Sequence, residues 1–250
     1  MIPLSRKCIS VTKQQIIDKI MLSIKDLKVS YGESEVIEDL NLELAQGEIL
    51  AVMGRNGMGK TTLFKSIIGV LGCGPKSSIK IDGVEVAHDP SYKRVRAGLA
   101  YVPQGRMIYP TMTVTDNIRV GLETAKAKKI PDYIYELFPV LHEMGKRKGG
   151  NLSGGQQQQL AIARALVTEP KVLLLDEPTE GIQPSIIKEM ARTLKTIRDM
   201  HNISIIVAEQ VLSFTLDSCD RFLVMEGGSI VHSSPRADVD AEKIKKFLSV

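Results

Sequence analysis

The sequence predicts an α/β fold with a mostly parallel core sheet, a small antiparallel β subdomain and a helical subdomain. Mainly apolar runs at 48–53 and 171–176 have the length of strands that are buried on both faces of a parallel sheet. Strand and helix patterns alternate over 171–232, whereas the pattern from about 105 to 167 is mainly helical. With 250 residues, of which 43% are hydrophobic, the chain can bury a sizeable core.

Residues 1–20 are expected to be an extension that is not part of the core. They hold three of the four net positive charges, and they lack the apolar segment and cleavage site of a secretory signal. A short amphipathic helix at 11–20 is the alternative. The remainder is close to neutral and only 4% of the chain is aromatic, which disfavours a nucleic-acid partner. We expect the folded domain to span 21–250.

The residues before and after the first apolar run indicate antiparallel strands. Alternation over 22–50 predicts a small antiparallel sheet around Tyr31. A strand at 79–81, a turn at Asp82 and Gly83, and a strand at 98–102 are expected to add to this half of the molecule.

A phosphate-binding loop follows the run at 48–53. The segment Gly54–Thr61 has the pattern GxxxxGK[ST], and a helical pattern at 62–68 comes after it. This strand–loop–helix context is the one that a P-loop requires. Three glycines keep side chains away from the phosphates or allow positive φ angles: Gly54, Gly57 and Gly59. The motif predicts a P-loop NTPase.

The P-loop residues have separate expected roles toward ATP. Lys60 is expected to reach the β- and γ-phosphates, Thr61 to hold Mg²⁺, and the helix N-terminus to add a partial positive charge. The candidate nucleotide-binding residues here are Gly54, Arg55, Asn56, Gly57, Met58, Gly59, Lys60, Thr61 and Thr62.

Two carboxylates end the run at 171–176. Ligands bind at the carboxyl ends of parallel strands, so Asp176 is expected to hold Mg²⁺ and Glu177 to polarise the water that attacks the γ-phosphate. A solvated acidic turn is the alternative, and the P-loop upstream makes it the weaker one.

A third motif, Leu152–Gln156, reads LSGGQ and precedes a helical pattern at 157–167. With the P-loop and the acidic pair, it resembles the signature of ABC transporter ATP-binding subunits, and the resemblance covers nearly everything from Met21 onward. In that family the signature turn binds the γ-phosphate of ATP held by a second subunit. The resemblance therefore implies that two subunits enclose two nucleotides, and that the binding residues include Ser153, Gly154, Gly155 and Gln156.

Two further positions match the family. Tyr31 resembles the aromatic residue that stacks on adenine, although a lone Tyr is more often simply half-buried. Gln104, in the sequence YVPQ, resembles the Gln that contacts Mg²⁺ and the attacking water and connects the nucleotide to the helical subdomain at about 105–167. In the family that subdomain receives a cytoplasmic helix of the membrane permease.

The sequence departs from the family pattern at Gln210, which occupies the position where most members have a His. A Gln offers an amide donor but carries no charge near neutral pH, so it should stabilise the phosphoryl transition state less well. Many relatives also have an Asp near the position of Gln183. Both departures resemble the branched-chain amino acid and urea uptake branch, and the stretches 105–110 and 180–185 look closest to the urea-system subunit.

The resemblance implies an ATPase that powers a membrane importer for urea, short amides or branched-chain amino acids. The expected partners are a paralogous ATP-binding subunit or a second copy, membrane permease subunits, and indirectly a periplasmic solute-binding protein. The resemblance also implies the cytoplasmic face of the inner membrane as the expected place. No apolar run approaches the roughly 20 residues that cross a bilayer, so the transport path is expected to belong to another polypeptide. The ATP site formed by the P-loop of this chain is expected to hydrolyse ATP slowly because of Gln210.

Two other functions remain open from the sequence. One is a non-transport ABC ATPase that acts on a soluble partner, of the Fe–S assembly or chromosome-maintenance type. The other is an adaptor that binds ATP for assembly without meaningful hydrolysis; Gln210 favours it, and Glu177 argues against it. Three widely spaced cysteines, without a metal-ligand pattern, are expected to be free thiols of a reducing cytosol: Cys8, Cys73 and Cys219.

Overall fold

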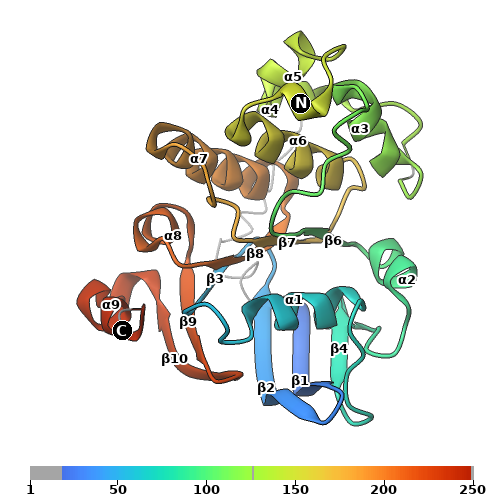
Figure 1. The fold of residues 1–250 in the computed structure, drawn as a ribbon. Helices are drawn as coiled ribbons and strands as arrows, with labels where there is room; N and C mark the ends of the chain where they lie inside the picture. Colours follow the sequence, from blue (N-terminus) through green and yellow to red (C-terminus); the bar gives the residue numbers. More distant parts are fainter. Residues whose placement is uncertain (1–18, 126, 249–250) are drawn as a thin grey trace, which may run out of the picture.

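The computed structural model describes residues 19–125 and 127–248. Within them the chain forms a four-stranded antiparallel sheet of order β2-β1-β4-β5 and a six-stranded sheet of order β10-β9-β3-β8-β7-β6 (Figure 1). The pairs β9–β3, β3–β8, β8–β7 and β7–β6 are parallel, and β10 pairs antiparallel with β9. The predicted α/β fold with a mostly parallel core sheet and a smaller antiparallel sheet is confirmed.

The antiparallel sheet consists of β1 (Ile20–Tyr31), β2 (Ser34–Ala45), β4 (Ser78–Ile81) and β5 (Val84–Glu85). Its turn at Asp82 and Gly83 has positive φ at both residues, 49° and 82°, as a two-residue hairpin requires. Asp82 also forms ion pairs with Lys19 and Lys171. Because Ile20 already belongs to a strand, the alternative helix at 11–20 is wrong at that residue, and residues 1–18 lie outside the described part.

The core sheet consists of β3 (Ile49–Met53), β6 (Leu99–Val102), β7 (Val172–Asp176), β8 (Ser204–Glu209), β9 (Arg221–Glu226) and β10 (Ser229–Pro235). Every residue of β3, β7 and β8 is buried, as expected for strands covered on both faces. The strand expected at 98–102 belongs here and not to the antiparallel half, because Leu99 pairs with Val172 of β7.

Helices lie on both faces of the core sheet. The helices of the described residues are α1 (Lys60–Ile68), α2 (Ser91–Arg96), α3 (Val114–Leu122), α4 (Asp132–Leu137), α5 (Pro139–Glu143), α6 (Gly154–Leu166), α7 (Pro184–His201), α8 (Leu212–Ser218) and α9 (Ala241–Leu248). Alternate residues of β3 enter different cores: Leu50 packs with α1 and the antiparallel sheet, and Ala51 packs with the α6 and α7 side. Figure 1 shows α3 to α6 gathered on that second side.

Side chains cap the start of α3 and the start of α6. Helix α3 begins at Val114 after the cap Thr113, whose side chain accepts the Asp116 N–H. Helix α6, expected from 157, begins three residues earlier because Ser153 caps it. Within α6, Gln158 is buried at 3% exposure.

The helices of residues 19–125 and 127–248 include none that is both long and apolar enough to cross a lipid bilayer.

Candidate functional site

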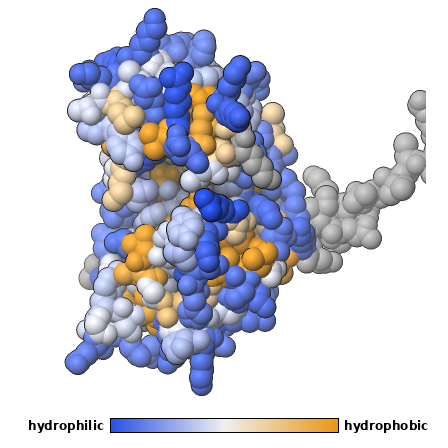
Figure 2. All heavy atoms as spheres, turned by 90° about the vertical axis from the view of Figure 1, so that its right-hand side faces the viewer, coloured by the Kyte–Doolittle hydropathy of each residue, from blue (hydrophilic) through white to orange (hydrophobic). Residues whose placement is uncertain are grey.

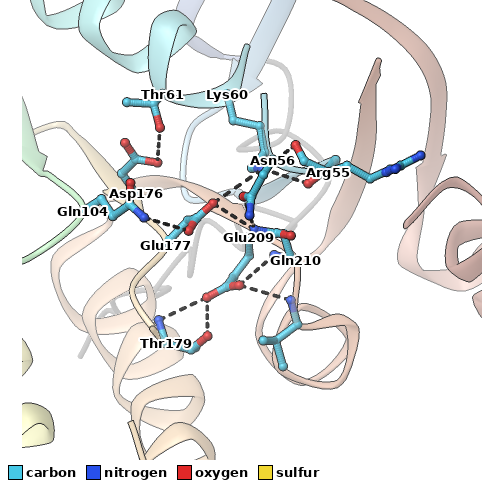
Figure 3. A network of polar contacts seen from close by, with 12 residues as sticks. Arg55, Asn56, Lys60, Thr61, Gln104, Asp176, Glu177, Thr179, Glu209 and Gln210 are labelled. Atoms are coloured by element: carbon cyan, nitrogen blue, oxygen red, sulfur yellow. Dashed lines mark hydrogen bonds and ion pairs between the residues drawn. The ribbon is translucent and has the colours of Figure 1, made fainter. Parts of the chain in front are cut away.

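The candidate site lies where four neighbouring strands of the core sheet end. The sheet order β3-β8-β7-β6 places side by side the carboxyl ends that lead to the P-loop, to Gln210, to Glu177 and to Gln104. Parallel strands present these ends at the same edge, which is where ligands bind in such sheets. Figure 3 shows the resulting polar network, in which three of these turns converge on the Glu177 carboxylate.

The P-loop folds as a cradle around the Lys60 ammonium. Lys60 is 4% exposed, and its Nζ donates to the carbonyl oxygens of Gly54 at 2.7 Å and Arg55 at 3.1 Å. Gly59, the residue before α1, has φ 101° and no side chain caps the helix, so the first backbone N–H groups of α1 are available to an anion. A Cβ on Gly54 would lie 2.5 Å from the Met225 carbonyl oxygen, which explains why a glycine begins the loop.

Asp176 lies beside the start of α1. Its carboxylate accepts the Thr61 hydroxyl at 3.3 Å and the Tyr101 hydroxyl at 3.1 Å. Burial raises the pKa of the Asp176 carboxyl above its ordinary value, while these two hydrogen bonds oppose the shift. Burial also raises the pKa of the Tyr101 hydroxyl well above its ordinary range, so Tyr101 is a stable donor. Tyr101 was not predicted as a site residue.

Glu177 is the centre of the network. Its Oε1 lies 3.5 Å from Lys60 Nζ and accepts Gln210 Nε2 at 3.0 Å, and its Oε2 accepts Gln104 Nε2 at 3.2 Å. The backbone of Glu177 has φ 47°, a left-handed conformation that is uncommon outside glycine, and its N–H donates to the Ala208 carbonyl. The fold thus places this carboxylate among three nitrogen donors from different elements.

Gln210 connects two of these turns. Besides Glu177, its Nε2 donates to Asn56 Oδ1 of the P-loop at 2.7 Å, so both amide hydrogens are used. The preceding residue, Glu209, is 2% exposed and accepts hydrogen bonds from Thr179 and from the backbone after β8. Glu209 and Thr179 were not predicted as site residues, although Glu209 is a carboxylate that directly follows an apolar run, as Asp176 does.

The LSGGQ segment lies apart from this cluster. Ser153 and Gln156 form a capping box at the start of α6: Ser153 Oγ accepts the Gln156 N–H and Gln156 Oε1 accepts the Ser153 N–H. A Cβ on Gly155 would lie 2.8 Å from Ile186 of α7. No hydrogen bond or ion pair between described residues joins Ser153–Gln156 to the P-loop cluster.

Tyr31 lies at the end of β1, opposite Ser34 in the turn of the β1–β2 hairpin, and is 47% exposed. This position leaves its ring available to stack on a flat ligand. The adenine role of Tyr31 stays a prediction.

The residues present fit a nucleotide with a divalent cation. A glycine-rich turn, an uncapped helix N-terminus and a buried ammonium together suit a polyphosphate. The hydroxyl of Thr61, the carboxylate of Asp176 and the amide oxygen of Gln104 are the kind of oxygen ligands that Mg²⁺ prefers, and they are the residues that would hold it.

Comparison with known proteins is consistent with this geometry. A family model described as "ABC transporter" matches residues 37–180. The high-affinity branched-chain amino acid transport ATP-binding protein BraG of Pseudomonas aeruginosa is 34% identical, over 90% of this chain and 97% of its own length. The probable branched-chain amino acid transport ATP-binding protein LivF of Archaeoglobus fulgidus is 32% identical, over 91% and 98%. The lipopolysaccharide export system ATP-binding protein LptB of Escherichia coli K12 is 32% identical, over 90% and 95%.

Solved structures have the same fold. The cbiO1 protein of Clostridium perfringens, described as part of the ABC transporter complex cbiONQ, has a TM-score of 0.77 and 26% identity over 91% of this chain and 93% of its own. A nucleotide-free ATP-binding cassette from an ABC transporter has a TM-score of 0.76 over 92% and 96%, and at 24% identity it supports the fold alone.

Proposed function

We propose that this chain, which belongs to the ABC transporter family as an ATP-binding subunit, hydrolyses ATP to power the uptake of a small solute through a membrane transporter. One observation carries the proposal: Lys60, Gln104 and Gln210 all contact the carboxylate of Glu177, at the same sheet edge as the P-loop. A nucleotide whose β- and γ-phosphates lie on Lys60 has Glu177 within reach of its γ-phosphate.

The residues then have separate roles in hydrolysis. Lys60 and the N-terminus of α1 neutralise the phosphates. Mg²⁺, held by Thr61 and Asp176 when bound, supplies further positive charge to the transferring phosphoryl group. When nucleotide binds, the phosphates replace Glu177 as the partner of the Lys60 ammonium, and Glu177 polarises the attacking water. Gln104 and Gln210 orient the Glu177 carboxylate and this water. The catalytic residues of the proposal are therefore Glu177, Gln104 and Gln210.

We place a second subunit over this site. The N-terminus of α6 at Ser153 lies outside the cluster, and its first glycines carry no side chains that would exclude a phosphate of another chain. Two subunits facing each other would bring each Ser153 turn onto the nucleotide of the other. Closing and reopening of this pair would drive the transporter by positioning, without new chemistry.

The helical subdomain at 105–167, within an ATPase domain that we take as 21–250, is the proposed contact with the permease. Within this subdomain, Met107 and Tyr109 between β6 and α3 have large exposed side chains, and Tyr92 in α2, outside it, is exposed as well. Figure 2 looks onto the side where α2 and α3 lie in Figure 1, and apolar patches alternate there with hydrophilic side chains. We place the subunit at the cytoplasmic face of the inner membrane.

For the solute we propose branched-chain amino acids, urea or short amides, delivered by a periplasmic solute-binding protein. The similarity to BraG and LivF supports the amino-acid side of this branch, and the stretches 105–110 and 180–185 motivate the urea side. The similarity to LptB, an export-system protein, favours export as the second candidate function. A non-transport ATPase with a soluble partner is the third, and it lacks a specific observation in its favour.

Reconstitution tests the proposal. The chain is co-expressed with the products of its neighbouring genes, purified through a tag on the chain, and reconstituted in vesicles. We expect permease subunits to copurify with the chain. ATP should drive solute across the membrane toward the side that carries the chain, and Lys60→Ala should abolish this transport. Movement of solute away from the side that carries the chain would favour the export function. A tagged chain that recovers a soluble partner and no membrane protein would contradict transport altogether.

We also propose that the site of this chain is the slower one in a pair with a paralogous subunit that carries a His at the Gln210 position. The test measures ATP turnover of the pair after Gln210→Ala in this chain, or after replacement of the partner's His by Ala. We expect the partner's change to cost more. If Gln210→Ala abolishes turnover and the partner's change does not, the asymmetry is refuted.

A further inference from the structure

Glu209 is a buried carboxylate for which the mechanism above has no use. It is the last residue of β8, it is 2% exposed, and it directly precedes Gln210. Its Oε1 accepts the Thr179 N–H at 3.0 Å and the Thr179 hydroxyl, and its Oε2 accepts the N–H groups of Gln210 at 2.7 Å and Val211 at 3.1 Å (Figure 3).

The two oxygens of Glu209 therefore serve two different turns. Oε1 holds the turn after β7, at a residue two positions beyond Glu177, and Oε2 holds the turn after β8 that carries Gln210. In all four hydrogen bonds the other group is the donor, which suits an ionised carboxylate because its oxygens only accept hydrogen bonds. Burying a charge is costly unless it is fully hydrogen-bonded, so an apolar residue would be the simpler occupant if packing were its whole purpose.

The side-chain contact between the same two turns depends on their spacing. Gln210 Nε2 reaches Glu177 Oε1 at 3.0 Å and Asn56 Oδ1 at 2.7 Å. These distances leave little room for the turn after β8 to shift, because a hydrogen bond weakens quickly beyond about 3.2 Å.

We propose that Glu209 is a positioning residue for ATP hydrolysis, which ties the turn after β7 to the turn after β8 and thereby holds the Gln210 amide against Glu177. The inference rests on the proposed function, since it assigns Glu209 an effect that passes through Gln210. It predicts that the two turns move as a unit and that their contacts with nucleotide are made or lost together.

Glu209→Gln is the informative substitution because it keeps shape and volume. One carboxylate oxygen becomes an NH₂ group, which donates hydrogen bonds and accepts none. If the amide oxygen faces Gln210 and Val211, the Thr179 N–H loses its acceptor; the reverse orientation frees the turn of Gln210. Either orientation cuts one side of the tie. Glu85→Gln is the matched control, because Glu85 also accepts two backbone N–H groups and one hydroxyl, but in the antiparallel sheet.

The experiment uses the full chain in complex with its transporter subunits. We expect Glu209→Gln to lower kcat for ATP by about 10- to 100-fold, with KM for ATP changed less than about 2-fold because the P-loop is untouched. In a Gln210→Ala background the same substitution should have little further effect on kcat. The amides of 178–180 and 210–212 should exchange hydrogen faster in Glu209→Gln, and Glu85→Gln should leave both kcat and these amides unchanged.

Thr179 offers a second pair of variants if Glu209→Gln folds poorly. Thr179→Val removes the hydroxyl donor and should lower kcat, and Thr179→Ser keeps the donor and should restore it. The proposal is overturned if Glu209→Gln lowers kcat equally with Gln210 and with Ala at 210, or if the two turns keep their hydrogen-exchange protection. A failure of the proposed function is recognised separately, because hydrolysis would then survive Glu177→Gln in the otherwise unchanged complex.

Discussion

In a Gln210→His variant we expect ATP to be hydrolysed faster than in the wild type. The Gln210 amide uses both hydrogens in the structure, one toward Asn56 Oδ1 at 2.7 Å and one toward Glu177 Oε1 at 3.0 Å. A His donates fewer bonds in its neutral form, so the variant should lose the Asn56 contact. In its protonated form it adds a positive charge next to the transferring phosphoryl group.

The size of the effect follows from the strengths of the two kinds of hydrogen bond. A neutral bond contributes about 0.5–1.5 kcal/mol net and a bond to a charged group about 1.5–3 kcal/mol. A difference of about 1 kcal/mol in the transition state corresponds to about 5-fold in rate. Because the ordinary pKa of His is about 6.5, the gain should be larger at pH 6 than at pH 8. The lost contact with Asn56 should lower the free energy of unfolding by about 1 kcal/mol.

The assay is steady-state phosphate release by the purified pair of ATP-binding subunits, measured from pH 6 to 8. Gln210→Ala is the control for loss of the donor and should be slower than the wild type. Glu177→Gln gives the background and should cost about 10²- to 10⁴-fold. Equal rates for the His, Gln and Ala variants would refute the reasoning, since they would show that the side chain at 210 does not face the reacting phosphate. A rate gain without pH dependence would refute the role of charge.

Three further outcomes follow from the packing and the pKa shifts. Two lysine hydrogen bonds lower the pKa of Asp82 to about 2, so Asp82→Asn should reduce the free energy of unfolding at pH 7 by up to about 1 kcal/mol. This loss should shrink as pH falls from about 4 through 2, because Asp82 becomes protonated first in the unfolded state and then in the folded state; equal losses at pH 7 and pH 2 in urea titrations would contradict it. Gly228→Ala should destabilise the fold by about 3 kcal/mol, because its Cβ would lie 1.8 Å from the Val36 carbonyl oxygen at a φ of 80°; an unchanged melting temperature would contradict this. Burial raises the pKa of the Cys219 thiol to about 12, so alkylation of native protein should modify Cys73 before Cys219, and mass spectrometry of these two peptides is the check.

The sequence was sufficient for the residues that follow predicted strands directly. Asp176 and Glu177 end an uninterrupted apolar run, and the P-loop follows another, so their places at strand ends follow from local pattern and from a general property of parallel sheets. The family resemblance, confirmed by the comparisons, added Gln104 as a residue expected to contact Mg²⁺ and the attacking water, which composition and periodicity could not give. Its hydrogen bond to Glu177 is seen only in the structure.

Contacts that depend on sheet order were beyond the sequence. Tyr101 reaches Asp176 because β6 pairs with β7, and Glu209 reaches Thr179 because β8 pairs with β7 on its other edge. Both pairings join segments 30 or more residues apart. The burial of Gln158 was beyond the sequence for a related reason. A Gln in a helical pattern is normally assigned to the exposed face, and only the packing of α6 against its neighbours shows that this one is buried.

Sheet order also gives the departure at Gln210 a physical meaning. In the chain the order is β3, β6, β7, β8, but in the sheet β8 lies between β3 and β7. The residue after β8 is therefore flanked by the P-loop on one side and by the acidic turn on the other, and a side chain there can contact both. The NH₂ group of Gln donates to Asn56 and to Glu177 at once, whereas a neutral imidazole has one N–H for the two acceptors. Gln at this position gives up a charge near the phosphate and gains a second tie across the site. We therefore expect a slower but better-ordered site. Gln210→His should reveal both properties, because we expect it to raise the rate of ATP hydrolysis and to lower the free energy of unfolding.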